Sequence, residues 1–226
     1  VKAEDDKYFI EPAHLEARRF LIDMFVDMAK TYHLDGIHLD YVRYPLQNPT
    51  AYGFSPYVKE RFEKSTGLEF PLNNRHSNWP AFSKFKEEQV TSFVAELRKE
   101  LLAIKPLQIS AAVFPGNDAL INKNQNWPLW VDEGYLDFIS LMLYSRSTQT
   151  VENWIKESLS TIGNKIPYYP ALAAISIPEG DLLLEQTLLI HKYGLDGVAF
   201  FAWQHFTEDS IATLSKGPFR NKATQY

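Results

Sequence analysis

The chain has 226 residues, of which 45% are hydrophobic and 14% aromatic, and its formal net charge is −5. This length and apolar content predict one domain over residues 1–226 with a substantial core. The acidic balance gives no basic field for nucleic acid, and no apolar run is long enough to span a bilayer. Cysteine is absent, which excludes disulfides, thiolate metal sites and cysteine nucleophiles.

The first predicted element is an amphipathic helix over residues 12–32, with Pro12 in its first turn. Its expected core-facing residues recur at helical spacing: Leu15, Phe20, Leu21, Met24, Phe25 and Met28. The helix leads through a tight turn into a short β-type segment, DGIHLDYVRYP, at residues 35–45. The order helix, turn and strand is therefore predicted at the start of the chain.

The same junction occurs three times, as Leu-Asp before an apolar strand. The copies are YHLDGIHLDY at 32–41, GYLDFISLMLY at 134–144 and YGLDGVAFFAW at 193–203. Two more strands are predicted at 108–114 and 166–173, with helices at 83–104, 151–162 and about 180–193. Strands that alternate with helices are typical of a parallel sheet.

Five strands are fewer than the eight of a closed (β/α)8 TIM barrel, which usually needs about 250 residues. The predicted fold class is therefore α/β, a TIM barrel that is incomplete at the N-terminus, with the missing strands upstream of Val1. An open doubly wound sheet is the alternative, although no glycine-rich phosphate loop such as GxGxxG follows any strand.

The three copies separate structural from functional aspartates. Asp35, Asp137 and Asp196 share one place before their strands, and we interpret all three as turn residues. Asp40 lies at the carboxyl end of its strand, where barrel active sites are built. Period-two alternation puts His38 and Asp40 on the inward face, opposite the apolar Ile37 and Leu39.

Two interpretations remain open for each of the inward-facing side chains, Asp40 and His38. Asp40 is predicted to be catalytic or to bind substrate, although it could simply pair with Arg43. His38 could be a satisfied interior histidine or a contact to substrate. Tyr41, Arg43 and Tyr44 follow directly and are predicted substrate contacts.

These segments together resemble the bacterial glycosyl-hydrolase-like family 10 proteins over nearly the whole chain. DGIHLDYVRYP is the most specific segment, and IKPLQISAAVFP, PLWVDEGYLDFISLMLY and YGLDGVAFFAW follow in the expected order. The resemblance implies a TIM barrel in which this chain supplies strands 4 to 8. It also implies a polysaccharide-active hydrolase that is exported or attached to the cell envelope. Asp40, Arg43, Tyr44, Tyr144 and Trp203 are the residues that carry over.

Glycosidic cleavage requires a second carboxyl group beside Asp40. We expect it to be Asp118, because FPGND leaves a strand directly. A carboxylate from the absent strands is equally compatible with the sequence. The other candidates in loops after strands, each of which could be a solvated charge or a helix cap, are Glu179, Glu208 and Asp209.

Sugar binding requires flat apolar faces beside hydrogen-bonding groups. Trp127, Tyr144, Trp203 and Gln204 provide them after strands, although core packing is the alternative for each tryptophan. The sequence has no HExxH or HxH motif and no GxSxG elbow, so no metal site, cofactor or serine nucleophile is predicted.

The predicted function is therefore a glycoside hydrolase that acts on a polysaccharide or oligosaccharide through carboxylate acid/base chemistry. The alternative from another class is a non-catalytic carbohydrate-binding barrel or envelope scaffold. A barrel enzyme with another reaction, a lyase or deacetylase, would carry a metal beside Asp40 and His38.

Overall fold

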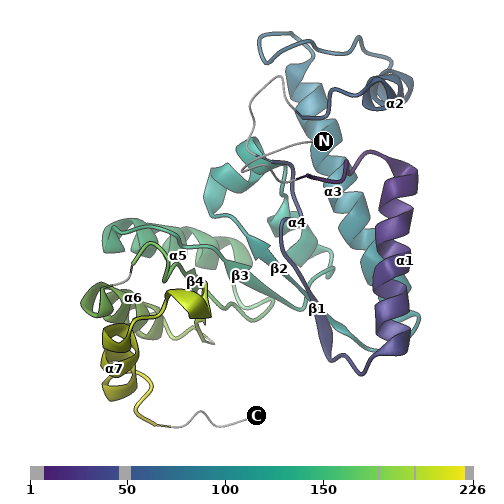
Figure 1. The fold of residues 1–226 in the computed structure, drawn as a ribbon. Helices are drawn as coiled ribbons and strands as arrows, with labels where there is room; N and C mark the ends of the chain where they lie inside the picture. The colour runs from purple at the N-terminus through teal and green to yellow at the C-terminus, as the bar shows by residue number, and fades with distance from the viewer. Residues whose placement is uncertain (1–7, 46–51, 178, 196, 222–226) are drawn as a thin grey trace. The chain divides into compact units, whose positions relative to one another are not determined.

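The computed structural model describes residues 8–45, 52–177, 179–195 and 197–221 (Figure 1). The chain forms two compact units. Unit 1 comprises Val1–Ala111 and Asn117–Asp137, and unit 2 comprises Ala112–Gly116 and Phe138–Tyr226. Each unit is described separately below.

Unit 1 contains the helices α1 to α4 and the first strands of the chain. Its elements are α1 (Leu15–Thr31), β1 (Gly36–Leu39), α2 (Pro56–Thr66), α3 (Trp79–Leu102), the first residues of β2 (Gln108–Val113), the π-helix η2 (Asp118–Asn122) and α4 (Trp127–Asp132). The predicted strand at 108–114 and the helix at 83–104 are confirmed, and β1 lies within the β-type segment predicted at 35–45, although α3 begins four residues earlier than expected.

Local sequence signals define α2, which the hydrophobic pattern did not predict. The Ser55 hydroxyl accepts a hydrogen bond from the Val58 N–H at 3.2 Å, and Pro56 occupies the first helical position. Gly67 ends the helix in the left-handed region at φ 69°. A standard N-cap, an N1 proline and a C-terminal glycine therefore bound a helix whose apolar face is short.

The apolar stripe predicted for α1 is largely not its buried face. Phe20 is 65% exposed and Met24 is 40% exposed, whereas Ile22 and Ala29 are buried. The helix packs against α3, and ion pairs from Arg18 to Glu96 (3.2 Å) and from Arg19 to Glu100 (3.1 Å) join the two helices. Pro12 lies in the turn before the helix, whose N-cap is His14. The prediction of the buried face was wrong because α1 has a second stripe of smaller apolar side chains, and this stripe packs against α3.

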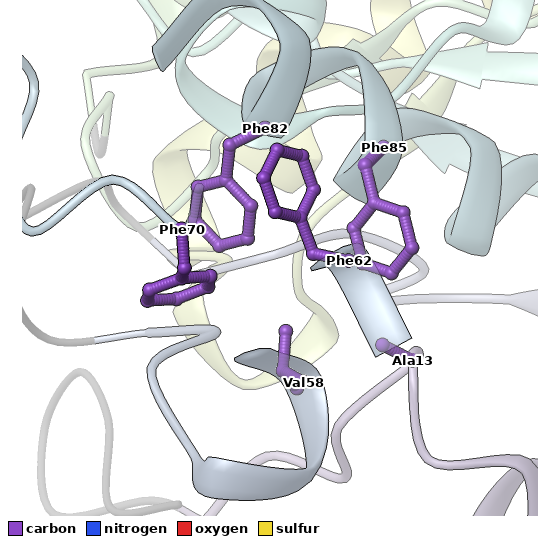
Figure 2. Close-up of a cluster of buried hydrophobic side chains, with 6 residues drawn as sticks. All are labelled: Ala13, Val58, Phe62, Phe70, Phe82 and Phe85. Carbon is purple, nitrogen blue, oxygen red and sulfur yellow. The ribbon is translucent and has the colours of Figure 1, made fainter. Parts of the chain in front are cut away.

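A cluster of aromatic side chains forms the core between α2 and α3 (Figure 2). Its buried members are Ala13, Val58, Phe62, Phe70, Phe82 and Phe85. Phe82 is fully buried and meets Phe62 and Phe70 edge to face, with ring centroids 5.4 and 4.9 Å apart. Trp79, the first residue of α3, packs against this cluster.

The strand β1 pairs in parallel with β2, with Gly36 opposite Gln108 and Leu39 opposite Ala111. Gly36 is required by close approach, because a Cβ atom there would lie 2.6 Å from the Gln108 carbonyl oxygen. Ile37 and Leu39 are buried while His38 is exposed, so the predicted alternation along β1 is confirmed.

Unit 2 continues the parallel strands with helices between them. Its elements are the end of β2, β3 (Phe138–Leu141), α5 (Thr148–Ile162), β4 (Ala171–Leu172), α6 (Gly180–Lys192), β5 (Ala199–Phe200), the 3-10 helix η3 (Trp203–His205) and α7 (Glu208–Lys216). The helices expected at 151–162 and 180–193 are confirmed. A capping box between Thr207 and Ser210 begins α7, which the sequence pattern did not predict.

The strands follow one another in chain order. One sheet has the order β1-β2-β3, and β4 pairs in parallel with β5. Parallel bridges join Ile139 to Tyr168 and Met142 to Ala171, which places β4 beside β3. This order is typical of βα repeats in barrels. The described residues form an α/β fold with five strands in two sheets, and these do not close into a barrel.

The Leu-Asp aspartates differ more than the turn interpretation allows. The Asp35 carbonyl accepts a hydrogen bond from the Gln108 N–H at 3.1 Å. Asp137 uses its side chain instead, accepting from the Ile109 N–H at 2.7 Å and pairing with Arg98 of α3. Asp137 is therefore an ion-paired anchor for β2 as well as a turn residue. Asp196 lies outside the described residues.

Candidate active site

The central candidate, Asp40, follows β1 directly and is exposed. Its Oδ1 atom accepts a hydrogen bond from the Tyr41 N–H at 2.8 Å. Alternation along a strand of four residues thus delivers a solvent-accessible carboxylate at the carboxyl end of the strand. A carboxylate in this place can accept or donate a proton, or attack an electrophilic carbon.

His38 lies two residues before Asp40 on the same face of β1. Its Nδ1 atom shares a hydrogen bond of 2.8 Å with the hydroxyl of Ser110, the residue opposite it on β2. Partial burial lowers the pKa of His38, and the nearby Asp40 carboxylate opposes that shift. The imidazole is therefore held in place by β2 and is biased toward its neutral form.

The backbone turns sharply after Asp40. Tyr41 has φ 56°, in the left-handed region that non-glycine residues seldom adopt. The turn brings the Tyr41 ring edge to face with Phe9, with centroids 5.7 Å apart, and the Arg43 guanidinium lies 4.9 Å from the Tyr41 centroid. Arg43 also lies over the Phe9 ring at 5.6 Å and donates from Nη1 to the Tyr44 carbonyl oxygen at 3.1 Å. The segment after β1 is thus held by two rings that meet edge to face and by a guanidinium over both of them.

Tyr44, a predicted substrate contact, is only 1% exposed. Its hydroxyl donates a short hydrogen bond to Glu11 Oε1, and its backbone N–H donates to the Lys123 carbonyl oxygen at 2.9 Å. Burial, together with the Glu11 carboxylate, raises the pKa of Tyr44 well above its ordinary value. Tyr44 therefore supports the loop from within, and we leave it out of the proposed sugar-contacting set.

A buried lysine lies behind Tyr44. Lys86 of α3 is 2% exposed, and its Nζ atom lies 5.0 to 5.2 Å from the ring centroids of Tyr44, Trp79 and Phe82. Burial lowers the pKa of Lys86 to about 8, and Glu11 opposes that shift. Three aromatic faces thus partly compensate an ammonium group that has lost its water.

Glu11 is the residue in this region that sequence reasoning missed. Its Oε1 atom accepts hydrogen bonds from the Tyr44 hydroxyl and from the Ala13 N–H, the latter at 3.1 Å. The side chain also lines a cavity beside Tyr41 and Arg43. The pairing with Tyr44 spans 33 residues, so no local signal in the sequence could have revealed it.

The expected second carboxylate, Asp118, is the first residue of η2 and is partly buried. It accepts a hydrogen bond from Asn122 Nδ2 at 2.7 Å. Trp127 begins α4 and is 2% exposed, so it packs in the interior and offers no face for a sugar. Its predicted stacking on substrate is therefore not supported, for the physical reason that the flat faces are covered by the core of unit 1.

In unit 2, the predicted sugar contacts lie on the surface. Tyr144 is 36% exposed and Trp203 is 77% exposed, and Gln204 is also exposed in η3. The Tyr144 ring stacks with Phe201 at a centroid distance of 6.1 Å and an interplanar angle of 24°. Phe201 is itself 49% exposed. Aromatic faces therefore follow both β3 and β5.

Two of the other loop carboxylates, Glu179 and Asp209, have structural partners. Glu179 pairs with Arg146 at 2.6 Å, and this hydrogen bond lowers the pKa of Glu179. Asp209 Oδ2 accepts from the Gly180 N–H at 3.2 Å, in the first turn of α7 together with Glu208. Their alternative interpretation as ion-pair and helix-end charges fits these contacts.

Two kinds of feature are absent from the part of the chain that the structure describes. No group of three or more histidine, aspartate or glutamate side chains there is arranged to hold a metal ion. No helix among the same residues is long and apolar enough to cross a membrane.

Comparison with solved structures shows that the fold of this chain is similar to the folds of two solved domains. The glycoside hydrolase domain of PgaB (BpsB) from Bordetella bronchiseptica matches with a TM-score of 0.67 and 15% identity, over 96% of this chain and 65% of that one. The catalytic domain of a β-amylase from Paenibacillus polymyxa matches with a TM-score of 0.58 and 11% identity, over 94% of this chain and 70% of that one. At these identities the likeness shows the fold alone.

Sequence comparison then gives the family. The Glycosyl hydrolase-like 10 family matches residues 1–161, and the chain belongs to this family, as the motif DGIHLDYVRYP predicted. An S-layer-related protein of Niallia circulans is 23% identical over 235 residues, which cover 83% of this chain and 14% of that protein. The chain thus spans about one seventh of this relative and 65% of the Bordetella domain.

Proposed function

We propose that this protein is a glycoside hydrolase that cleaves a polysaccharide with Asp40 as its essential carboxylate. The observation that carries the proposal is the exposed Asp40 at the carboxyl end of β1, within a chain of the glycosyl hydrolase-like family. Barrel active sites form at this end of the strands. We further propose that β1 to β5 are strands 4 to 8 of a (β/α)8 barrel, completed by upstream strands, because the strands follow in parallel order.

In this mechanism one carboxyl group protonates the leaving glycosidic oxygen. The other attacks the anomeric carbon or activates a water molecule that does so. We assign Asp40 to one of these roles and Asp118 to the other, with Glu11 as a competing candidate because it lines the cavity beside Tyr41. In unit 1, Arg43 orients the segment after Asp40, and His38 contacts the substrate near Asp40. In unit 2, the exposed residues Tyr144, Trp203 and Gln204 are assigned to sugar binding.

The envelope is the proposed location. The name of the S-layer-related protein of Niallia circulans supports this location. A polysaccharide of the cell surface or its surroundings is then the substrate.

The test is a screen of the full-length protein against a panel of polysaccharides, with release of reducing ends as the readout. Asp40→Asn should lower kcat by about 10³-fold, because loss of a general acid or base typically costs about 10²- to 10⁴-fold. Asp35→Asn is the matched control, since Asp35 lies in the same motif and its backbone carbonyl makes the bond to Gln108. Equal cleavage by wild type and Asp40→Asn would refute the assignment.

The second carboxylate is identified in the same assay. Asp118→Asn and Glu11→Gln are compared, and the true partner should lose activity to a similar extent as Asp40→Asn. If neither does, the partner lies elsewhere in the protein.

A non-catalytic carbohydrate-binding protein is the second candidate. The exposed aromatic rings of Tyr144, Phe201 and Trp203 favour it, because they can hold a sugar without any chemistry. If the protein binds a polysaccharide of the panel but releases no reducing ends from it, this result would favour the non-catalytic carbohydrate-binding function.

A further inference from the structure

A buried serine lies beside His38 on the neighbouring strand. Ser110 is opposite His38 in the parallel pairing of β1 with β2, so the two side chains project from the same face of the sheet. The Ser110 hydroxyl lies 2.8 Å from His38 Nδ1, and Ser110 is only 2% exposed. It is the single polar residue among the buried positions 109–113 of β2. A buried hydroxyl is unfavourable without a hydrogen bond, so the contact with His38 compensates its burial.

The partners of Ser110 determine the direction of this hydrogen bond. Within the described ranges, the Ser110 hydroxyl has no hydrogen-bond partner besides His38 Nδ1. If the hydroxyl accepted the bond from an Nδ1–H group, its own proton would be buried without an acceptor, which is costly. The hydroxyl therefore donates to Nδ1, and a neutral imidazole must then carry its proton on Nε2. Partial burial lowers the pKa of His38 and so favours this neutral form, although the Asp40 carboxylate opposes the shift.

The two polar groups at the carboxyl end of β1 are then complementary. Asp40 follows His38 by two residues on the same face, and its exposed carboxylate is a hydrogen-bond acceptor. In the Nε2–H tautomer, His38 is a donor. A sugar hydroxyl both donates and accepts, so a donor next to a carboxylate suits a substrate rich in hydroxyl groups. In the other tautomer Nε2 would be an acceptor, and it would compete with Asp40 for the same hydroxyl protons.

We propose that Ser110 is a positioning residue that holds neutral His38 in its Nε2–H tautomer, so that His38 donates a hydrogen bond to a sugar oxygen beside Asp40. The inference deepens the proposed function and rests on it for the identity of the ligand as a sugar. Ser110 acts through His38 and does not itself touch the sugar. His38 is thereby a hydrogen-bond donor to the substrate and not its general base.

The first test determines the tautomer without any substrate. ¹⁵N NMR of the full-length protein distinguishes protonated from unprotonated ring nitrogens, and the His38 signals are assigned by their loss in His38→Gln. At about pH 7.5, roughly one unit above the ordinary pKa of histidine, the ring is neutral. Nδ1 should be unprotonated and Nε2 protonated. Ser110→Ala should move the Nδ1 signal, whereas Ser140→Ala, which removes a buried hydroxyl from β3, should leave it unchanged.

Two results of this first test would overturn the inference. One is a proton on Nδ1 of His38 in the wild type, and the other is an Nδ1 signal that Ser110→Ala leaves unmoved. The wild-type spectrum decides the tautomer even if Ser110→Ala does not fold.

The second test asks which ring nitrogen serves the substrate, with the polysaccharide that the screen identifies. Glutamine at position 38 places an amide N–H near the position of Nε2, whereas asparagine places it near that of Nδ1. His38→Asn should therefore lower kcat/KM about tenfold further than His38→Gln, as expected for the loss of one hydrogen bond. An equal or greater loss in His38→Gln would overturn the donor role.

The two tests separate this inference from the proposed function. If no polysaccharide is cleaved but Ser110 holds the Nε2–H tautomer, the hydrolase is refuted and the role of Ser110 is kept. The two His38 variants are then compared by their affinity for a polysaccharide that binds. If a polysaccharide is cleaved while His38 carries its proton on Nδ1, the hydrolase is kept and the role of Ser110 is refuted.

Discussion

Aromatic residues follow β1 in unit 1 and also follow strands of unit 2, but the burial of Tyr44 after β1 differs from that of the rings in unit 2. Tyr44 is 1% exposed and bonded to Glu11, whereas Tyr144, Phe201 and Trp203 are 36%, 49% and 77% exposed. Tyr44 holds its loop in shape from within, although Tyr41 of the same segment is 43% exposed, and the three rings of unit 2 face solvent. All of these aromatic residues follow the end of a strand in the sequence. Their burial decides whether a ring supports the fold or can contact a ligand.

Truncation of the buried Tyr44 is the strongest test of this distinction between buried and exposed rings. Tyr44→Ala should lower the free energy of unfolding by about 3–5 kcal/mol, because it removes a large, fully buried aromatic side chain. Chemical denaturation measures the change. Tyr144→Ala is the matched control, and a loss of similar size there would contradict the distinction.

Lys86 gives a pH test of the same buried region. Its pKa is about 8 in the folded protein, below the ordinary 10.5, so between these values the unfolded chain binds more protons. Stability should therefore rise with pH across this window, by about 3 kcal/mol in total. Below pH 8 the cost of the buried charge is present in full.

Replacing this lysine should flatten the profile. In Lys86→Met the rise between pH 8 and 10.5 should be absent, and Lys84→Met, at an exposed lysine of the same helix, should retain it. Denaturation curves at several pH values provide the measurement. A rise that persists in Lys86→Met would show that another group is responsible.

The smallest effect on stability is expected at the exposed rings. Trp203→Ala should change the free energy of unfolding by no more than about 0.5 kcal/mol. It should weaken binding to the responsive polysaccharide by about tenfold, as loss of an aromatic contact often does. Titration of the Asp40→Asn protein with and without Trp203→Ala measures this, and unchanged affinity would remove Trp203 from the site.

Periodicity predicted the regular elements well. The strand at 108–114 and the helices at 83–104, 151–162 and 180–193 were all correctly located, and β1 lies within the segment predicted at 35–45. The three helices that were missed, α2, α4 and α7, are short and begin at caps or prolines, so their signals are local rather than periodic. The face of α1 was wrong because a helix with two possible apolar stripes leaves the choice to its tertiary partner.

The side-chain directions in the candidate active site were predictable only along β1 and as far as Asp40. Alternation along β1 placed Asp40 at an exposed strand end, since a strand fixes the direction of successive side chains. Beyond Asp40 the left-handed turn at Tyr41 breaks this period, so the burial of Tyr44 could not be inferred. The roles of Glu11 and Ser110 depend on contacts between distant segments, which one sequence does not reveal.

The missing side chain of Gly36 sets a boundary for redesign of the motif. The Gln108 carbonyl oxygen occupies the space that any Cβ atom would need, at 2.6 Å. An engineer could vary His38, whose side chain is exposed, but even alanine at position 36 would force β1 away from β2. The Asp40 carboxylate would move with the strand. A library that randomises the whole motif would therefore lose most of its correctly folded members at position 36, where the native residue has no side chain.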